Sequence, residues 1–322
     1  MGRTKHLDRN KRKNPTSIIL IVLSIIAFII LSYFSINNYK QIIKENNKNK
    51  ELTTKLNNTK NDKINILSKQ KELQEKISEF DNLDNLIKEA KEETFKKAST
   101  LETKIINNET NYKIAYITFD DGPYHMTDEV LQVLKNNKVK ATFFTIGEDK
   151  ETCYDNRNYS CADTYKKIVD GGHTIANHTY SHAIFRGLYS SADAFIYQVK
   201  KQEELIKDKT GVTTNILRFP GGNGTAKALA GSYAESQIIE RLKENGYGWV
   251  DWTAQDGDGG YVAGYSDAWR NFTGSINENI EVVLFHDYSY VTLSILDDAI
   301  KYLQDNNYIL LPLFYDSVKI NK

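Results

Sequence analysis

Two adjacent carboxylates, Asp120 and Asp121, end an apolar segment and are followed directly by the turn-forming pair 122–123, Gly-Pro. The apolar residues 114–119 before them predict a buried strand. In α/β folds, residues that perform catalysis or bind metal gather at the carboxyl ends of strands. An Asp-Asp turn ahead of a helix capped by Thr127 or Asp128 would explain the same residues without chemistry. Taken alone, the pair leaves both interpretations open.

Histidine spacing favours a metal site. Only six histidines occur in the 322 residues, and His173, His178 and His182 lie close together. His178 and His182 are four positions apart, which in a helix would place both imidazoles on one face and is the spacing of a two-histidine metal clamp. A carboxylate from a neighbouring strand end would complete a three-ligand site with a fourth position open for water, as in catalytic zinc sites. We expect His173, in the preceding strand-like segment, to be structural.

The elements that must position these residues alternate along the chain from residue 113. Apolar runs predict strands at 113–119, 140–146, 173–178, 214–218, 248–252, 281–286 and 307–314. Amphipathic patterns predict helices at about 127–137, 162–170, 191–209, 235–245 and 293–305. Such alternation predicts an α/β fold with a parallel sheet, and the candidate residues fall at strand carboxyl ends.

Four motifs in this region resemble those of the polysaccharide deacetylases, the NodB-homology enzymes of carbohydrate esterase family 4. They are Thr-Phe-Asp-Asp-Gly-Pro at 118–123, His-Thr-x-x-His at 178–182, Arg-Phe-Pro-Gly-Gly at 218–222 and Leu-Phe-His-Asp at 284–287. The resemblance covers roughly residues 112–318. It implies a distorted (β/α) barrel that removes N-acetyl groups from polysaccharides with the help of a metal.

The resemblance implies a divalent metal held by Asp121, His178 and His182. Zinc is the first expectation, and cobalt, nickel and manganese are alternatives. A metal addresses both difficulties of amide hydrolysis, because it lowers the pKa of a bound water and polarises the carbonyl.

The same resemblance implies the proton-transfer groups. Asp120 would be the general base, held in orientation and kept ionised by Arg218. His286 would be the general acid for the leaving amine, with its pKa raised by Asp258. Three residues are implied for the oxyanion and acetyl pocket: Gly221, Leu284 and Trp252.

The fourth family motif, usually an aspartate followed by tryptophan, is where the sequence departs. Asp258 followed by Gly259 is our first assignment, and Asp256 is the rival. The glycine removes one apolar wall of the acetyl pocket, which Trp252 or Trp249 would have to replace. This departure leaves room for an inactive glycan-binding scaffold on the same fold.

The N-terminal third predicts a membrane anchor and a spacer. Residues 1–16 are a basic tail, and 17–36 are uncharged and rich in Ile and Leu, enough to cross a bilayer. The preceding positive charge predicts a cytoplasmic N-terminus and an extracellular catalytic domain. We favour an uncleaved signal anchor over a cleaved signal peptide, because no small-x-small cleavage pattern follows.

Residues 37–111 predict a helical stalk. The segment is dense in Lys, Glu and Asn, and apolar residues recur every seven positions from Ile66 to Ile87 in an imperfect heptad pattern. A weak, self-associating coiled coil and a solvated, partly disordered helix are equally open. The catalytic domain is then expected at 112–322. Cys153 and Cys161, the only cysteines, predict a disulfide that closes an extracellular loop.

The expected substrate is a cell-surface glycan within reach of the anchor. Peptidoglycan N-acetylglucosamine is our first expectation, a poly-N-acetylglucosamine exopolysaccharide the second, and N-acetylmuramic acid stays open. The 42 basic residues balance 42 acidic ones, so nothing indicates a nucleic-acid partner.

Overall fold

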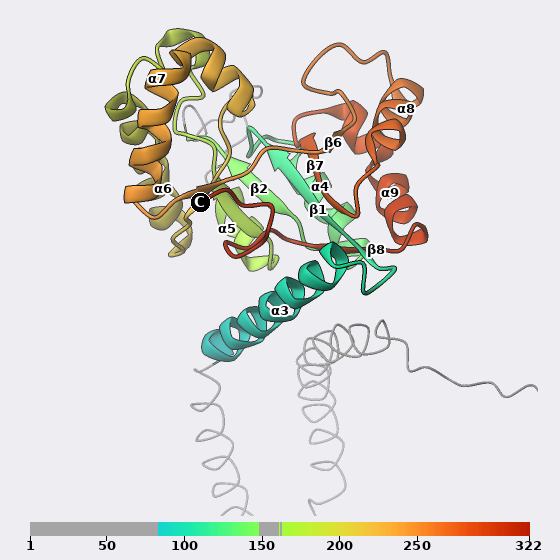
Figure 1. Ribbon diagram of the computed structural model, residues 1–322. Coiled ribbons are helices and arrows are strands. Elements are labelled where there is room, and N and C mark those ends of the chain that lie inside the picture. Colours follow the sequence, from blue (N-terminus) through green and yellow to red (C-terminus); the bar gives the residue numbers. More distant parts are fainter. Residues whose placement is uncertain (1–82, 148–160, 162) are drawn as a thin grey trace, which may run out of the picture. The chain divides into compact units, whose positions relative to one another are not determined.

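The computed structural model describes residues 83–147, 161 and 163–322 (Figure 1). Contacts define a compact unit from Phe95 to Lys322. Within the described residues, no helix combines the length and the apolar character that a bilayer crossing requires. The predicted tail and anchor at 1–36, the stalk up to residue 82 and Cys153 lie outside the described residues. The tail, the anchor, the stalk before residue 83 and the domain boundary at 111/112 are not tested by the structure and stay predictions.

Eight short strands form one parallel sheet in the described part of the chain. They are β1 (Lys113–Asp120), β2 (Thr142–Thr145), β3 (Thr174–Asn177), β4 (Ile216–Leu217), β5 (Gly248–Trp249), β6 (Ala254–Gln255), β7 (Ile280–His286) and β8 (Tyr308–Leu311). The order is β5-β4-β3-β2-β1-β7-β6, with β8 also paired to β1. Because this path has two ends, the sheet is a curled half-barrel, consistent with the predicted distorted (β/α) barrel.

The distortion has its origin at β1. One edge of β1 pairs with β7 from Ile114 to Asp120. Along the other edge, β8 pairs with Lys113–Tyr116 and β2 with Thr118–Asp120, so two strands share one neighbour. All eight strands run parallel, and their carboxyl ends therefore meet at one edge of the sheet.

Helices connect the strands and cover the outer face of the sheet. They are α4 (Thr127–Asn136), α5 (Thr164–Asp170), α6 (Ala192–Thr210), α7 (Gly222–Glu244), α8 (Tyr265–Ser275) and α9 (Tyr290–Asp305). Serine caps begin α6 and α9, since Ser191 accepts from the Ala194 N–H and Ser289 from the Thr292 N–H, both at 3.1 Å. Gly211, in the left-handed conformation at φ 74°, ends α6.

The sequence prediction missed three features of this arrangement. The helix expected at 235–245 begins much earlier, at Gly222, and is kinked at Gly231. Helix α8 and strand β6 were not predicted, because β6 has only two residues and the segment around α8 is polar. The kink follows from the non-helical φ of 77° that glycine adopts readily.

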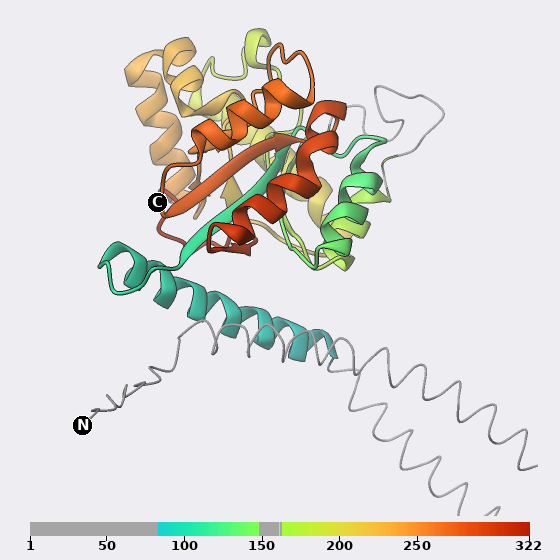
Figure 2. The ribbon, with the colours of Figure 1, turned by 90° about the vertical axis from the view of Figure 1, so that its right-hand side faces the viewer.

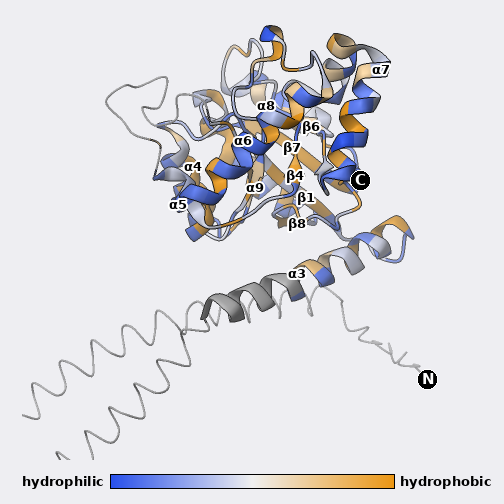
Figure 3. Ribbon diagram, turned by 90° about the vertical axis from the view of Figure 1, so that its left-hand side faces the viewer, coloured by the Kyte–Doolittle hydropathy of each residue, from blue (hydrophilic) through white to orange (hydrophobic). Residues whose placement is uncertain are grey.

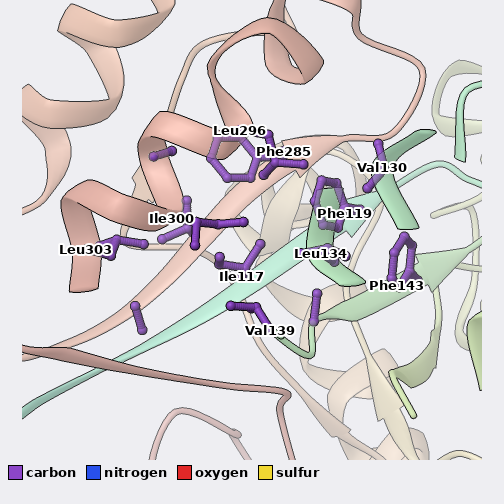
Figure 4. Close-up of a cluster of buried hydrophobic side chains, with 14 of the residues drawn as sticks. Ile117, Phe119, Val130, Leu134, Val139, Phe143, Phe285, Leu296, Ile300 and Leu303 are labelled. Carbon is purple, nitrogen blue, oxygen red and sulfur yellow. The ribbon is translucent and has the colours of Figure 1, made fainter. Parts of the chain in front are cut away.

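The main core lies between the sheet and helices α4, α5, α8 and α9. Figure 2 shows α8 and α9 on the same face of β1 and β7, and Figure 3 shows hydrophobic residues along these strands. Alternate residues of β1, including Ile117 and Phe119, point into this core (Figure 4). They meet Leu296, Ile300 and Phe285, all fully buried. The intervening residues of β1 therefore face the inside of the curled sheet.

Of the predicted stalk, the structure describes only the C-terminal part, where Leu83–Ile106 forms helix α3. From Phe95 on, this helix belongs to the compact unit. Phe95 stacks on Phe314 with ring centroids 5.0 Å apart. The fully buried Glu102 accepts hydrogen bonds from Tyr116 Oη at 2.7 Å and Ser317 Oγ at 2.6 Å. A carboxylate with these donors fastens the end of α3 to the sheet.

Candidate metal and catalytic site

The motif residues meet at the carboxyl edge of the sheet. Asp120 ends β1 and lies in register with His286, which ends β7. His178 and Arg218 each follow the last residue of a strand, and those two strands, β3 and β4, are paired through Asn177 and Leu217. Four motifs that are far apart in the sequence are therefore brought to one place by strand pairing.

The turn after β1 separates the two aspartates. Asp120 is the last strand residue, whereas Asp121 has the left-handed φ of 69°, which a non-glycine residue adopts rarely. Gly122 follows, and a Cβ there would lie 2.2 Å from Oδ2 of the buried Asp287. Glycine is thus required at 122 by this close approach, and the turn directs the Asp121 carboxylate toward the loop after β3.

The two histidines of the second motif lie in that loop, and the expectation that a helix aligns them is wrong. Thr179 and His182 both have positive φ, 66° and 50°. The turn is held by side chains: Asn177 Oδ1 accepts from the Thr179 N–H at 2.8 Å, and Thr179 Oγ1 accepts from the His182 N–H at 3.3 Å. This turn brings the rings of His178 and His182 to a centroid distance of 5.0 Å.

Asp121, His178 and His182 form a three-residue cluster suited to a cation. Their ligand atoms lie within 4.8 Å of one another. Oδ1 of Asp121 is 3.4 Å from Nε2 of His178 and 3.2 Å from Nε2 of His182, and this buried oxygen has no hydrogen-bond partner among the described residues. A buried, unpaired carboxylate oxygen between two imidazole nitrogens fits a divalent cation with nitrogen and oxygen ligands.

The protonation states agree with that fit. Nδ1 of His178 donates to the Arg218 carbonyl at 2.8 Å, which leaves the Nε2 lone pair facing the cluster. The pKa of His182 is lowered, chiefly by burial, so its imidazole is neutral at pH 7. Burial alone would raise the pKa of Asp121, but the adjacent imidazoles of His178, His182 and His286 hold it well below its usual range.

Asp120 is paired with a fully buried arginine. Nη1 of Arg218 donates to Asp120 Oδ1 at 2.8 Å and to Thr118 Oγ1 at 2.7 Å. Nε donates to the Val250 carbonyl at 3.2 Å and Nη2 to the Asp251 carbonyl at 3.3 Å. With four donor contacts, the guanidinium is anchored from several sides, and it fixes one oxygen of Asp120 while Oδ2 faces the cluster.

His286 is held by Asp258, not by Asp256. Nδ1 of His286 is 2.7 Å from Asp258 Oδ1, and its backbone N–H donates to Asp258 Oδ2 at 2.9 Å. Burial by itself would lower the pKa of His286, but Asp258 more than reverses this and raises it to about 9. Asp256 instead contacts Thr292. The geometry thus favours the first assignment of the fourth motif.

The residues expected to line the pocket lie around this cluster. Leu284, two residues before His286, is on the same face of β7 and is buried. Gly221 has a φ of 74° and is the N-cap residue that directly precedes α7. The Trp252 ring packs against Gly222, where a Cβ would lie 3.0 Å from the ring. A Cβ at Gly259 would lie 3.1 Å from Cε1 of His286.

Trp249 does not replace the missing wall. It is 8% exposed and packs in a second core cluster against Phe219, with ring centroids 6.3 Å apart. His173 is buried and accepts from the Ala141 N–H at 3.1 Å, which is the structural role expected for it. Cys161 is buried and disulfide-bonded. Its predicted pairing with Cys153 stays a prediction.

Sequence reasoning missed two supporting threonines. Thr118 contacts Arg218 and its hydroxyl donates to the Val283 carbonyl at 2.8 Å. Its position two residues before Asp120, on the same strand face, is a signal that could have identified it. Thr292 contacts Asp258 from α9. Nothing in the local sequence distinguishes this threonine, because its role depends on how α9 packs.

Comparison with known proteins places this site in a family. The family model described as "Polysaccharide deacetylase" matches residues 107–238, a range that includes the first three motifs. A peptidoglycan-N-acetylglucosamine deacetylase of Bacillus cereus is 27% identical over 201 residues, covering 61% of this chain and 67% of that protein. The chain spans about half to two thirds of the length of the curated relatives that it matches.

Solved structures agree with the sequence comparison. The catalytic domain of a peptidoglycan N-acetylglucosamine deacetylase from Eubacterium rectale matches with a TM-score of 0.58 and 30% identity, covering 66% of this chain and 93% of that one. A polysaccharide deacetylase from Bacillus cereus matches with a TM-score of 0.55 and 25% identity, covering 64% and 94%. The shared fold, the ordered motifs and this coverage lead to one conclusion: the chain belongs to the polysaccharide deacetylase family.

Proposed function

We propose that this protein hydrolyses N-acetyl groups of a cell-surface glycan. The favoured substrate is the N-acetylglucosamine of peptidoglycan. One observation carries the proposal. The Asp121-His178-His182 cluster lies at the same sheet edge as two pairs suited to proton transfer, Asp120–Arg218 and His286–Asp258. The relatives named as peptidoglycan deacetylases support this choice of polymer.

In this proposal, Asp121, His178 and His182 hold a divalent cation, with zinc as the first candidate. Such a cation supplies Lewis acidity, which favours the deprotonation of water and polarises a carbonyl oxygen. The left-handed turn at Asp121 and the side-chain-bonded loop of the histidines orient the three ligands before binding.

Asp120 is the general base of the proposed reaction. Arg218 occupies its Oδ1, and Oδ2 faces the cation cluster at 3.6 Å from Nε2 of His178. From there, Oδ2 takes the proton of the water whose oxygen attacks the amide carbonyl carbon. The guanidinium contacts only Oδ1, so Oδ2 is left available to accept this proton.

His286 is the general acid. Asp258 holds Nδ1, and Nε2 faces the cluster at 3.9 Å from Asp121 Oδ2. As the carbon–nitrogen bond of the amide breaks, Nε2 gives its proton to the leaving amine, and the products are acetate and a free amino sugar. The backbone at Gly221 is proposed to stabilise the oxyanion, and Leu284 with Trp252 to line the acetyl pocket.

We also propose that the domain acts outside the cell, tethered by an anchor at residues 17–36 and a stalk at 37–111. The basic tail followed by an uncharged, apolar segment supports the orientation. Weak self-association through the stalk is part of this proposal. Labelling of an engineered cysteine in the stalk of intact cells tests the topology: an unreactive cysteine that becomes reactive only after lysis contradicts it.

The function is tested with the purified full-length chain in detergent. Acetate release is measured from peptidoglycan and, separately, from poly-N-acetylglucosamine oligomers, with zinc added or removed by chelation. We expect zinc-dependent release from peptidoglycan, a rate lowered by about 10²- to 10⁴-fold in Asp120→Asn, and full release from Lys104→Ala, an exposed control. Release only from the oligomers would favour the exopolysaccharide. Glycan binding without release from either polymer would favour an inactive scaffold.

A further inference from the structure

A second buried carboxylate lies behind the His286–Asp258 pair. Asp256 follows β6 and is fully buried, yet no step of the proposed reaction uses it. Its Oδ1 accepts from the backbone N–H of Asp258 at 3.1 Å. Its Oδ2 lies 2.7 Å from Oγ1 of Thr292, in the first turn of α9.

Thr292 contacts both carboxylates through the same oxygen. Its Oγ1 is 2.7 Å from Asp256 Oδ2 and 2.5 Å from Asp258 Oδ2. A hydroxyl has one hydrogen, so it can donate to only one of these two oxygens. If both aspartates were ionised, the other contact would bring two oxygens together without a proton between them. One of the two carboxyl groups must therefore carry a proton.

The proton belongs on Asp256. Asp258 already accepts two hydrogen bonds from His286, from Nδ1 at 2.7 Å and from the backbone N–H at 2.9 Å, which favours its ionised form. Although burial opposes it, the contact with His286 lowers the pKa of Asp258. Burial, followed by the charge of Asp258, raises the pKa of Asp256 to about 7.

We propose that Asp256 is a positioning residue of the deacetylase site: as a neutral acid it donates to Thr292, Thr292 donates to Asp258, and this chain holds Asp258 against His286. The inference rests on the proposed function for its catalytic consequence. It assigns Asp256 a role separate from the fourth-motif role, for which it was the rival candidate.

The surroundings of Asp256 are consistent with a neutral acid. Asp258, from the same loop, is the charged group that faces it, and His286 on β7 lies beyond Asp258. Helix α8 contributes the amide of Asn271, which donates to the Asp256 backbone carbonyl at 3.0 Å, and α9 contributes the Thr292 hydroxyl. Neither helix brings a cation that this carboxyl contacts in the described structure.

Ionisation of Asp256 would remove the support. Once Asp256 loses its proton, Thr292 can satisfy only one carboxylate, and two negative charges face each other across the hydroxyl. The pKa of Asp256 in the folded chain lies above its unfolded value, so its contribution to stability is complete below about pH 4 and is lost as pH rises toward about 7. Catalysis should weaken as pH rises through about 7, where Asp256 ionises in the folded chain and the hold on His286 loosens.

The test is Asp256→Asn, because an asparagine amide donates to Thr292 and its carbonyl accepts from the Asp258 N–H, as the neutral acid does. We expect near wild-type kcat at about pH 6 and an alkaline limb of kcat moved up by about one pH unit or more. We also expect the melting temperature of this variant to rise relative to wild type between about pH 5 and pH 7.5.

Two further variants separate positioning from general damage to the fold. Asp256→Ala should lower kcat about tenfold or more with little change in KM, since it removes support for the acid and not for the substrate. Thr292→Ser keeps the hydroxyl and should retain activity, whereas Thr292→Val should behave like Asp256→Ala. If Asp256→Ala fails to fold, the comparison of the two Thr292 variants carries this part of the test.

Two results would overturn the inference. One is an Asp256→Asn variant as impaired as Asp256→Ala at every pH, which would mean that the ionised carboxylate is needed. The other is a melting-temperature difference between wild type and Asp256→Asn that stays constant from about pH 5 to pH 7.5. The melting comparison needs no activity. If wild type releases no acetate, the proposed function fails while the proton on Asp256 is still tested.

Discussion

Asp120 and Asp121 adjoin in the chain and both carboxylates lie near His178 Nε2, yet only Asp120 pairs with the buried guanidinium of Arg218, and only Asp121 also faces His182. The left-handed φ of 69° at Asp121 ends the extended strand conformation between the two residues, so the second carboxylate is not placed as the next residue of a strand would be. Two chemically identical side chains thereby acquire different environments, and this is the physical basis for assigning them different roles.

Substitution of the two aspartates should therefore affect activity and zinc binding differently. Asp120→Asn should lower the rate of acetate release about 10²- to 10⁴-fold while zinc still binds, since it removes only the proton acceptor. Asp121→Asn should lose zinc as well as activity. Acetate release and zinc titration by calorimetry, run on both variants, check this. Loss of zinc in Asp120→Asn with retention in Asp121→Asn would reverse the assignment of base and ligand.

Arg218 should be important for stability as well as for activity. Arg218→Met leaves Asp120 as a buried, unpaired charge, and we expect a loss of about 3–5 kcal/mol in the free energy of unfolding. Arg218→Met combined with Asp120→Asn should recover part of that loss. The control is Arg241→Met, which breaks a solvent-exposed pair with Asp193 and should cost at most about 1 kcal/mol. Denaturant melts of these three variants and of the wild type measure these differences.

The titration of His286 should depend on Asp258. Its folded pKa of about 9 exceeds the ordinary 6.5, because Asp258 outweighs the lowering effect of burial. The stability that this charge contributes is thus present below about pH 6.5 and lost as pH rises through about 9. In Asp258→Asn, burial is opposed only by the charges of Asp121 and Asp120, so the pKa of His286 should fall below its wild-type value of about 9. Imidazole NMR titration of chelator-treated protein checks this, and an unchanged pKa would contradict it.

Glu102 should hold the end of α3 on the sheet. Glu102→Ala removes the acceptor of the buried Tyr116 hydroxyl, and we expect a loss of about 1–3 kcal/mol in unfolding free energy for each donor left unsatisfied. Adding Tyr116→Phe removes that orphaned donor, so the second substitution should cost less in the Glu102→Ala background than in wild type. Thermal melts of the double-mutant cycle measure this coupling, and strictly additive effects would disprove it.

Much of the site could be predicted from local sequence. The apolar run of β1 and its terminal aspartates, and the strand-end position of His286, are readable because side-chain alternation and turn residues act over a few positions. The structure places the strand ends together as the alternation of strands and helices predicts. Helix α8 was not predicted, because its segment of sequence is largely polar and its apolar face is short.

Other features depend on contacts between distant elements. The spacing of His178 and His182 predicted a helix, but side-chain hydrogen bonds in the loop after β3 provide the alignment instead. The choice between Asp256 and Asp258 was open in the sequence, since both belong to one glycine-rich loop. It was decided by the end of β7, where only Asp258 reaches the imidazole of His286.

The sequence by itself determined which residues are available for chemistry and at which strand ends they lie, because strand formation and motif spacing are local properties. The tertiary structure alone decided how protons and charges are distributed among them. The shared contact of Thr292 with both aspartates joins residues 34 and 36 positions apart. Such a contact depends on how α9 packs beside β7, and no local pattern of residues encodes that packing.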